Sequence, residues 1–150
     1  MKKLVRNGPV DRRFGVPRIA IRIAILLAFG FATVGGALAT PQSFNYRGTP
    51  LLTGGVSEEE REAMRQEIAP YNVWLVFVER DTGNYVSGAK ISLVDSSGNA
   101  VVDTVSDGPW LLAQVPPGQY KIRTADGQEQ AVTAGTGTRA MTILRLPRQP

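Results

Sequence analysis

The residue types that this chain lacks narrow the chemistry it can perform. Its 150 residues include no cysteine and no histidine. Without them the sequence offers no thiolate nucleophile, no Ser-His-Asp triad, and no sulfur or imidazole ligand for a metal ion. We therefore expect no enzymatic activity, no metal site and no cofactor.

Two sets of oxygen-bearing side chains remain as candidates for chemistry. Asp103 lies in an expected strand and Asp107 in the following turn, whereas a glycosidase needs two carboxyl groups held across a cleft. The segment Asp95-Ser-Ser-Gly-Asn99 has too few carboxylates for calcium, which takes about six to eight oxygen ligands. Both sets are more typical of turns, where an aspartate accepts hydrogen bonds from nearby backbone N–H groups.

Aromatic side chains are the remaining candidates for a binding surface, because they stack on sugar rings or anchor partner proteins. We expect Trp110 to pack in the core or at a strand end. The exposure of Trp74 depends on whether a neighbouring helix packs over it. Without that helix, Trp74, Val76 and Val78 form an exposed apolar stripe, which is typical of an interface. The candidate binding surface therefore consists of Trp74, Val76, Val78 and Trp110.

The positive charge of the chain is concentrated near its start. Residues 1–39 hold seven Lys or Arg and one Asp, whereas residues 40–150 hold ten Lys or Arg and twelve Asp or Glu. The early cations precede an uncharged run over 23–39 that ends in Ala-Leu-Ala. This order is typical of a secretory signal peptide, cleaved here after Ala39. No basic patch remains for nucleic acid, so we expect no nucleic-acid partner.

The same segment could instead stay attached as an N-terminal membrane anchor. The uncharged run has 17 residues, which is at the lower limit for crossing a bilayer. Arg22 could extend its charged end to the cytoplasmic side, so that residues 19–39 contact the inner membrane. The first alternative predicts a periplasmic or secreted protein, and the second predicts a protein anchored to the inner membrane.

A short amphipathic helix is predicted over residues 57–69. Ser57 and Glu60 form a capping box at its start. Its apolar stripe is narrow, because only Met64 and Ile68 lie four residues apart on one face. We expect such a helix to pack lightly or not at all.

Residues 40–56, which precede this helix, are rich in Gly, Pro, Ser and Thr and predict a flexible linker. Short apolar segments separated by turns follow the helix. We expect seven strands, over residues 72–80, 89–94, 100–105, 110–115, 119–125, 128–133 and 138–146. Their spacing, with no helix between them, is typical of a mainly β, antiparallel Greek-key sandwich. The first strand has apolar residues on both faces, so we expect it to be central or covered by the preceding helix.

Two turns are expected to join neighbouring strands as hairpins. Pro117-Gly118 fits the centre of a type II turn, with a positive φ at Gly118, between the strands at 110–115 and 119–125. Asp126-Gly127 is a typical hairpin dipeptide.

These residues resemble the carboxypeptidase regulatory-like domains. The family pattern is matched by Gly88-Ala89, Asp107-Gly108, and Pro116-Pro117-Gly118 followed by Tyr120. The resemblance covers about residues 71–148 and implies a prealbumin-like (transthyretin-like) seven-stranded sandwich. Tyr71-Asn-Val is further similar to small exported proteobacterial proteins that carry only this domain. Because one sandwich fold hosts many roles, the resemblance does not identify a function.

We therefore expect a non-enzymatic, exported module that mediates protein–protein contact in the periplasm or cell envelope. It would bury the face around Trp74 or pair along an edge strand. The alternative is a carbohydrate or cell-wall binding module that uses Trp74 or Trp110. The expected partner is thus an envelope protein or a glycan.

Overall fold

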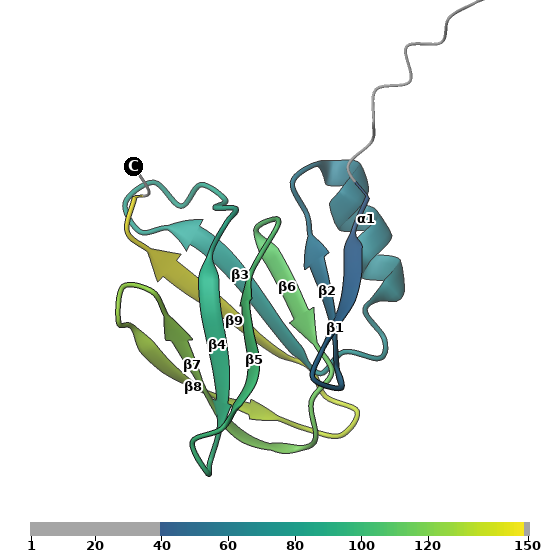
Figure 1. Cartoon of the computed structure of the whole chain (residues 1–150). Helices are drawn as coiled ribbons and strands as arrows, with labels where there is room; N and C mark the ends of the chain where they lie inside the picture. The colour runs from purple at the N-terminus through teal and green to yellow at the C-terminus, as the bar shows by residue number, and fades with distance from the viewer. Residues whose placement is uncertain (1–39, 149–150) are drawn as a thin grey trace, which may run out of the picture. The chain divides into compact units, whose positions relative to one another are not determined.

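Two β-sheets packed face to face, with one helix, make up the part of the chain that the structure describes (Figure 1). The computed structural model describes residues 40–148. The signal peptide or anchor expected over residues 1–39 lies outside the described residues. Among residues 40–148, no helix has the length and apolar character needed to cross a membrane.

Sheet A contains five strands in the order β1-β2-β6-β3-β9. Their bounds are β1 Gln42–Tyr46, β2 Thr49–Gly54, β6 Trp110–Ala113, β3 Val73–Glu79 and β9 Ala140–Leu146. β3 and β9 run parallel, whereas the other neighbours run antiparallel. The expectation of a purely antiparallel sandwich is therefore wrong. β9 follows a strand of the opposite sheet, so no hairpin forces it to run antiparallel to β3.

Sheet B contains four antiparallel strands in the order β5-β4-β7-β8. Their bounds are β4 Lys90–Asp95, β5 Ala100–Val105, β7 Gly118–Thr124 and β8 Glu129–Ala134. β7 and β8 are joined at Asp126-Gly127, where Gly127 has a φ of 82°, so the hairpin predicted there is confirmed. The core between the sheets is formed by alternate residues of both, among them Leu75, Phe77 and Ile122.

The described residues contain nine strands rather than seven, because the segment predicted as a flexible linker forms β1 and β2. All seven predicted strands are present as β3 to β9. In β2, Leu51 is buried between the sheets and Leu52 on the opposite face. These two leucines, and pairing of β2 with β6, tie the hairpin into sheet A. Because β2 is short and has glycines and a proline in and around it, the composition of this segment indicated a linker rather than a strand.

The Pro116-Pro117-Gly118 segment is not a hairpin turn, which corrects a second prediction. β6 belongs to sheet A and β7 to sheet B, so the segment carries the chain from one sheet to the other. Gly118 begins β7 and is not among the residues with positive φ. Prolines have no N–H to contribute to a strand ladder, which favours leaving the sheet at this point. The Tyr120 hydroxyl donates to the Pro116 carbonyl at 2.7 Å and fastens the crossing.

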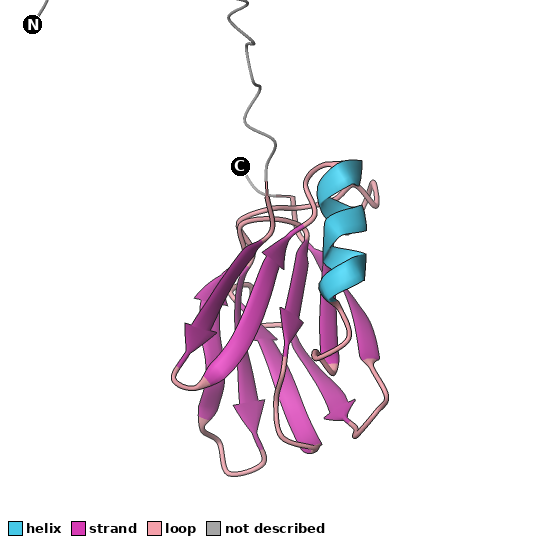
Figure 2. Cartoon of the chain, turned by 90° about the vertical axis from the view of Figure 1, so that its right-hand side faces the viewer, coloured by secondary structure: helices cyan, strands magenta, loops and turns pink. Residues whose placement is uncertain are grey.

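The helix α1, Glu58–Glu67, lies against the outer face of sheet A (Figure 2). The predicted N-cap is confirmed, because the Ser57 hydroxyl accepts from the Glu60 N–H at 3.1 Å. The Glu60 carboxylate, however, accepts from the N–H of Val56 at 2.8 Å rather than from that of Ser57. Contrary to expectation the helix packs firmly, since Met64 is completely buried.

Candidate binding surface

The outer face of sheet A, which points away from sheet B, carries a second apolar cluster. Along β3, side chains alternate between the two faces, so Trp74, Val76 and Val78 all point outward. The buried members of this outer cluster come from β2, β3, β6 and α1: Leu52, Met64, Val76, Val78, Trp110 and Leu112. Trp74 packs against them from its margin. The predicted surface residues thus do share one face.

Trp110 lies at the centre of this cluster and is only 4% exposed. The Trp74 ring meets it edge-on, with 4.7 Å between the ring centroids and 68° between the planes. The Arg65 guanidinium lies 5.3 Å from the centre of the Trp110 ring. Gly55 is so close that a Cβ there would lie 3.1 Å from Trp110 Cγ. Trp110 therefore packs, as the sequence favoured, and presents no exposed face to a ligand.

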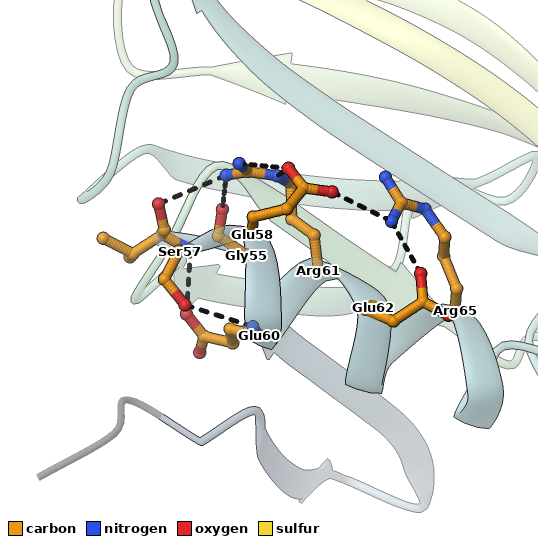
Figure 3. Close-up of polar contacts among 8 residues, drawn as sticks. Gly55, Ser57, Glu58, Glu60, Arg61, Glu62 and Arg65 are labelled. Carbon is orange, nitrogen blue, oxygen red and sulfur yellow. Dashed lines mark hydrogen bonds and ion pairs between the residues drawn. The ribbon is translucent and has the colours of Figure 1, made fainter.

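Charged side chains pair with one another along α1, and Arg61 also joins the helix to the loop before it (Figure 3). Glu58 accepts from Arg61 at 2.7 Å and from Arg65 at 3.2 Å, and Arg61 also donates to the Gly55 carbonyl at 2.8 Å. Hydrogen bonds, first from Arg61 and then from Arg65, lower the pKa of Glu58 below its ordinary value. Arg65 also forms an ion pair with Glu62 at 3.0 Å. The acidic start of the helix is thus explained by local pairing and needs no ligand.

The exposed stripe considered for Trp74, Val76 and Val78 does not exist as such. Val76 and Val78 are buried and Trp74 is only partly exposed. The physical reason is packing within the outer cluster, in which both valines lie with the Trp110 ring and with Met64 of α1. These residues lie together, but they form the floor beneath the helix rather than an open surface.

The same apolar face continues without cover on β9. Met141 lies beside Trp74 and Ile143 beside Val76 in the parallel register. Met141 is 58% exposed and Ile143 is 48% exposed. Neither residue is among the candidates predicted from the sequence. A signal was present in the sequence, because apolar residues occur on both faces of this strand.

β9 also has a backbone edge that is free at Met141 and Ile143. Ala140 donates to the Asn72 carbonyl at 2.9 Å and Leu146 accepts from the Arg80 N–H at 2.8 Å, so these residues direct their backbone groups toward β3. Alternate residues point the other way, and the N–H and C=O groups of Met141 and Ile143 therefore face away from the sheet. Within residues 40–148, no strand pairs with this edge, but the Gln128 side chain donates to the Arg145 carbonyl on it at 3.2 Å. Such an edge can accept a strand from another chain.

Two hollows lie elsewhere on residues 40–148, and each is lined by one tyrosine, Tyr120 in the first and Tyr71 in the second. A groove of about 450 Å³ on sheet B is bordered by Lys121 and Arg123. Both cations pair with Glu129, at 3.0 and 2.7 Å, and their hydrogen bonds lower the pKa of Glu129. A crevice of about 310 Å³ surrounds Asn72 at one end of the sandwich. Neither hollow is lined by a tryptophan.

The acidic residues considered for chemistry have structural roles or stand apart. Asp95 accepts from the N–H groups of Ser97 and Asn99, both at 2.9 Å, which confirms the turn. Asp103 is exposed on β5 and Asp107 is exposed in the turn that follows. In the described part of the chain, no three acidic residues gather in a way that could hold a metal ion.

Comparisons with known proteins add little to this description. No protein-family model matches the chain, and no curated protein is similar to it in sequence. Among solved structures, the chain is similar to the major pilin subunit of Bacillus cereus, with 16% identity and a TM-score of 0.36 over 50% of this chain. The match spans 28% of the length of that pilin. The β-sandwich class is thus confirmed by the fold itself, while membership of the carboxypeptidase regulatory-like family stays a prediction.

Proposed function

We propose that this protein is a non-enzymatic, exported β-sandwich module that binds a partner protein through β9. The observation that carries the proposal is the position of Met141 and Ile143, exposed on an edge strand and continuous with Trp74. When a partner covers exposed apolar side chains, apolar surface is removed from water and the free energy of the complex is lowered. The unpaired N–H and C=O groups of these two residues offer hydrogen bonds to an added strand.

The export part of the proposal is supported by the sequence of residues 1–39. A charged start, an uncharged run and an Ala-Leu-Ala end belong together in secretory leaders. The non-enzymatic part is supported by the residue types, because the sequence supplies neither histidine nor cysteine.

The outer face gives less support to the carbohydrate alternative. Stacking on a sugar ring needs an aromatic face that is open to solvent. Trp110 is buried, and Trp74 packs with Trp110 and has its Nε1 atom buried. The exposed apolar residues of β9 on this face, Met141 and Ile143, are instead not aromatic and lie on a strand edge, which suits a polypeptide.

Site-specific photocrosslinking in the native cells tests the proposal. A photoreactive amino acid is placed at Met141 or Ile143 and, as a matched control, at Val105. Val105 is similarly exposed, at 52%, and lies on β5 at the edge of the other sheet. We expect a discrete protein adduct from positions 141 and 143 and none from 105. Equal labelling at all three positions, or no adduct at 141 and 143, would overturn the proposal.

A further inference from the structure

The outward side chains of β9 and the residue before it form a row with a symmetric pattern. They are Arg139, Met141, Ile143 and Arg145, which we call the β9 row. All four are exposed on the outer face of sheet A. The alternate residues are buried on the inner face: Thr142, Leu144 and Leu146. Read along the strand, the β9 row is cationic, apolar, apolar, cationic.

The two cations of the β9 row are not neutralised by neighbouring carboxylates. Arg139 donates to the carbonyls of Ile68 at 2.9 Å and Tyr71 at 3.2 Å, which are uncharged acceptors. The backbone of Arg145 accepts from Gln128 at 3.2 Å. Neither guanidinium forms an ion pair with any residue of the 40–148 region. Residues 139–148 contain three arginines and no acidic residue, although residues 40–150 as a whole are slightly acidic.

This charge pattern disfavours a second copy of the chain as the occupant of the edge. In the antiparallel register that places the apolar pairs of two copies together, Met141 lies opposite Ile143 of the other copy. The same register places Arg139 of one copy opposite Arg145 of the other. Like charges directly opposite one another across two strands are destabilising. The complementary occupant is therefore one that carries negative charge.

We infer that the partner contributes an extended segment whose alternate residues read acidic, apolar, apolar, acidic, and which adds to sheet A beside β9. The inference rests on the proposed function and specifies the partner chemistry. Its acidic residues would lie opposite Arg139 and Arg145, and its apolar residues opposite Met141 and Ile143. Backbone hydrogen bonds and apolar burial supply the affinity, while the charges select the partner and its register.

Binding of synthetic peptides to the full chain tests this chemistry. The probe is the labelled peptide Thr-Glu-Thr-Val-Thr-Val-Thr-Glu-Thr with blocked ends, and the matched peptide has lysine in place of both glutamates. A third peptide has the composition of the first in an order without alternation. We expect fluorescence anisotropy at low salt to show the acidic peptide binding at least tenfold more tightly than the other two. Added salt should reduce its advantage over the lysine peptide.

A charge reversal on the protein provides the second arm. Arg145→Glu should reverse the preference, so that the lysine peptide binds more tightly than the acidic one. Lys90→Glu makes the same change of net charge on β4 of the other sheet, at an exposed position, and should leave the preference unchanged. Circular dichroism and thermal unfolding would confirm that both variants fold.

The outcomes separate the inference from the proposed function. Binding without charge preference, or a preference that Lys90→Glu changes as much as Arg145→Glu, would overturn the inference. Failure of every peptide to bind would also overturn it, while an adduct from position 141 would preserve the proposed function. Self-association in analytical ultracentrifugation that Ile143→Lys abolishes would identify a second copy as the occupant and likewise overturn the inference.

Discussion

The side-chain amide of Asn72 forms a closed pair of hydrogen bonds with the backbone of Val115. Asn72 Nδ2 donates to the Val115 carbonyl at 2.7 Å, and the Val115 N–H donates to Asn72 Oδ1 at 3.0 Å. Nδ2 also lies 3.3 Å from the Gly135 carbonyl, and the Asn72 backbone carbonyl accepts from Ala140. Asn72, which directly precedes β3, thus connects the end of β6, the β8–β9 loop and the start of β9 by hydrogen bonds. It helps to position the β9 row.

Replacing Asn72 should destabilise the whole sandwich. Asn72→Ala removes the side-chain partners of a backbone N–H and two carbonyls, and we expect a loss of about 2–3 kcal/mol in the free energy of unfolding. Urea denaturation measures the loss. Asn99→Ala is the control, because Asn99 is exposed and its side chain makes one long contact of 3.5 Å. Equal effects of the two variants would contradict a fastening role for Asn72.

Because of the Tyr120 hydroxyl, the free energy of unfolding should depend on pH in the alkaline range. Tyr120→Phe removes the hydrogen bond to Pro116 and should lower the free energy of unfolding at pH 7 by about 1 kcal/mol. Burial, and to a lesser degree the charge of Asp95, raises the pKa of Tyr120 above its ordinary value of 10.0.

The sign of this pH effect follows from the raised pKa. Because the folded-state pKa exceeds the unfolded one, the stability from Tyr120 is fully present below pH 10 and is lost as the pH rises through the folded-state pKa. Denaturant titrations from pH 7 to 11 should show the wild type losing its advantage over Tyr120→Phe. A difference that stays constant, or grows, above pH 10 would contradict this assignment.

Substitution by alanine should destabilise the protein at Gly108 but not at Gly118. Gly108 is buried, and a Cβ there would overlap the carbonyl oxygen of Gly54. Gly118 has only Tyr120 Cε2 nearby, at 3.8 Å, and has no positive φ. Thermal unfolding should show Gly108→Ala to be destabilised by about 1–3 kcal/mol through overpacking. Gly118→Ala should be nearly neutral, and a large loss there would support the discarded hairpin turn.

Truncation of Met64 tests how firmly α1 packs. Met64→Ala leaves a cavity beneath the helix and should cost about 2–4 kcal/mol of stability. It should also shift tryptophan emission, because Met64 belongs to the same buried cluster as Trp110. Gln66→Ala, on the exposed side of the helix, should change neither quantity. A small effect of Met64→Ala would restore the expectation of a loosely packed helix.

Local sequence signals predicted much of the secondary structure. The alternation of apolar residues and the turn residues between them located β3 to β9, and Ser57 located the start of α1. Each of these signals acts over a few neighbouring residues, through side-chain period or a cap. β1 and β2 were not predicted because β2 is placed by pairing with β6, which is more than fifty residues away, and β1 in turn pairs with β2.

The candidate site divides in the same way. The sequence by itself determined that Trp74, Val76 and Val78 share one face of a strand, because side chains alternate along any extended chain. Only the tertiary structure decided that α1 covers that face, that β9 lies parallel to β3 at the edge, and that Met141 and Ile143 stay exposed. Those outcomes depend on which distant segments pack together. Exposure is a property of the assembled sheet and its helix, not of the strand that carries the residue.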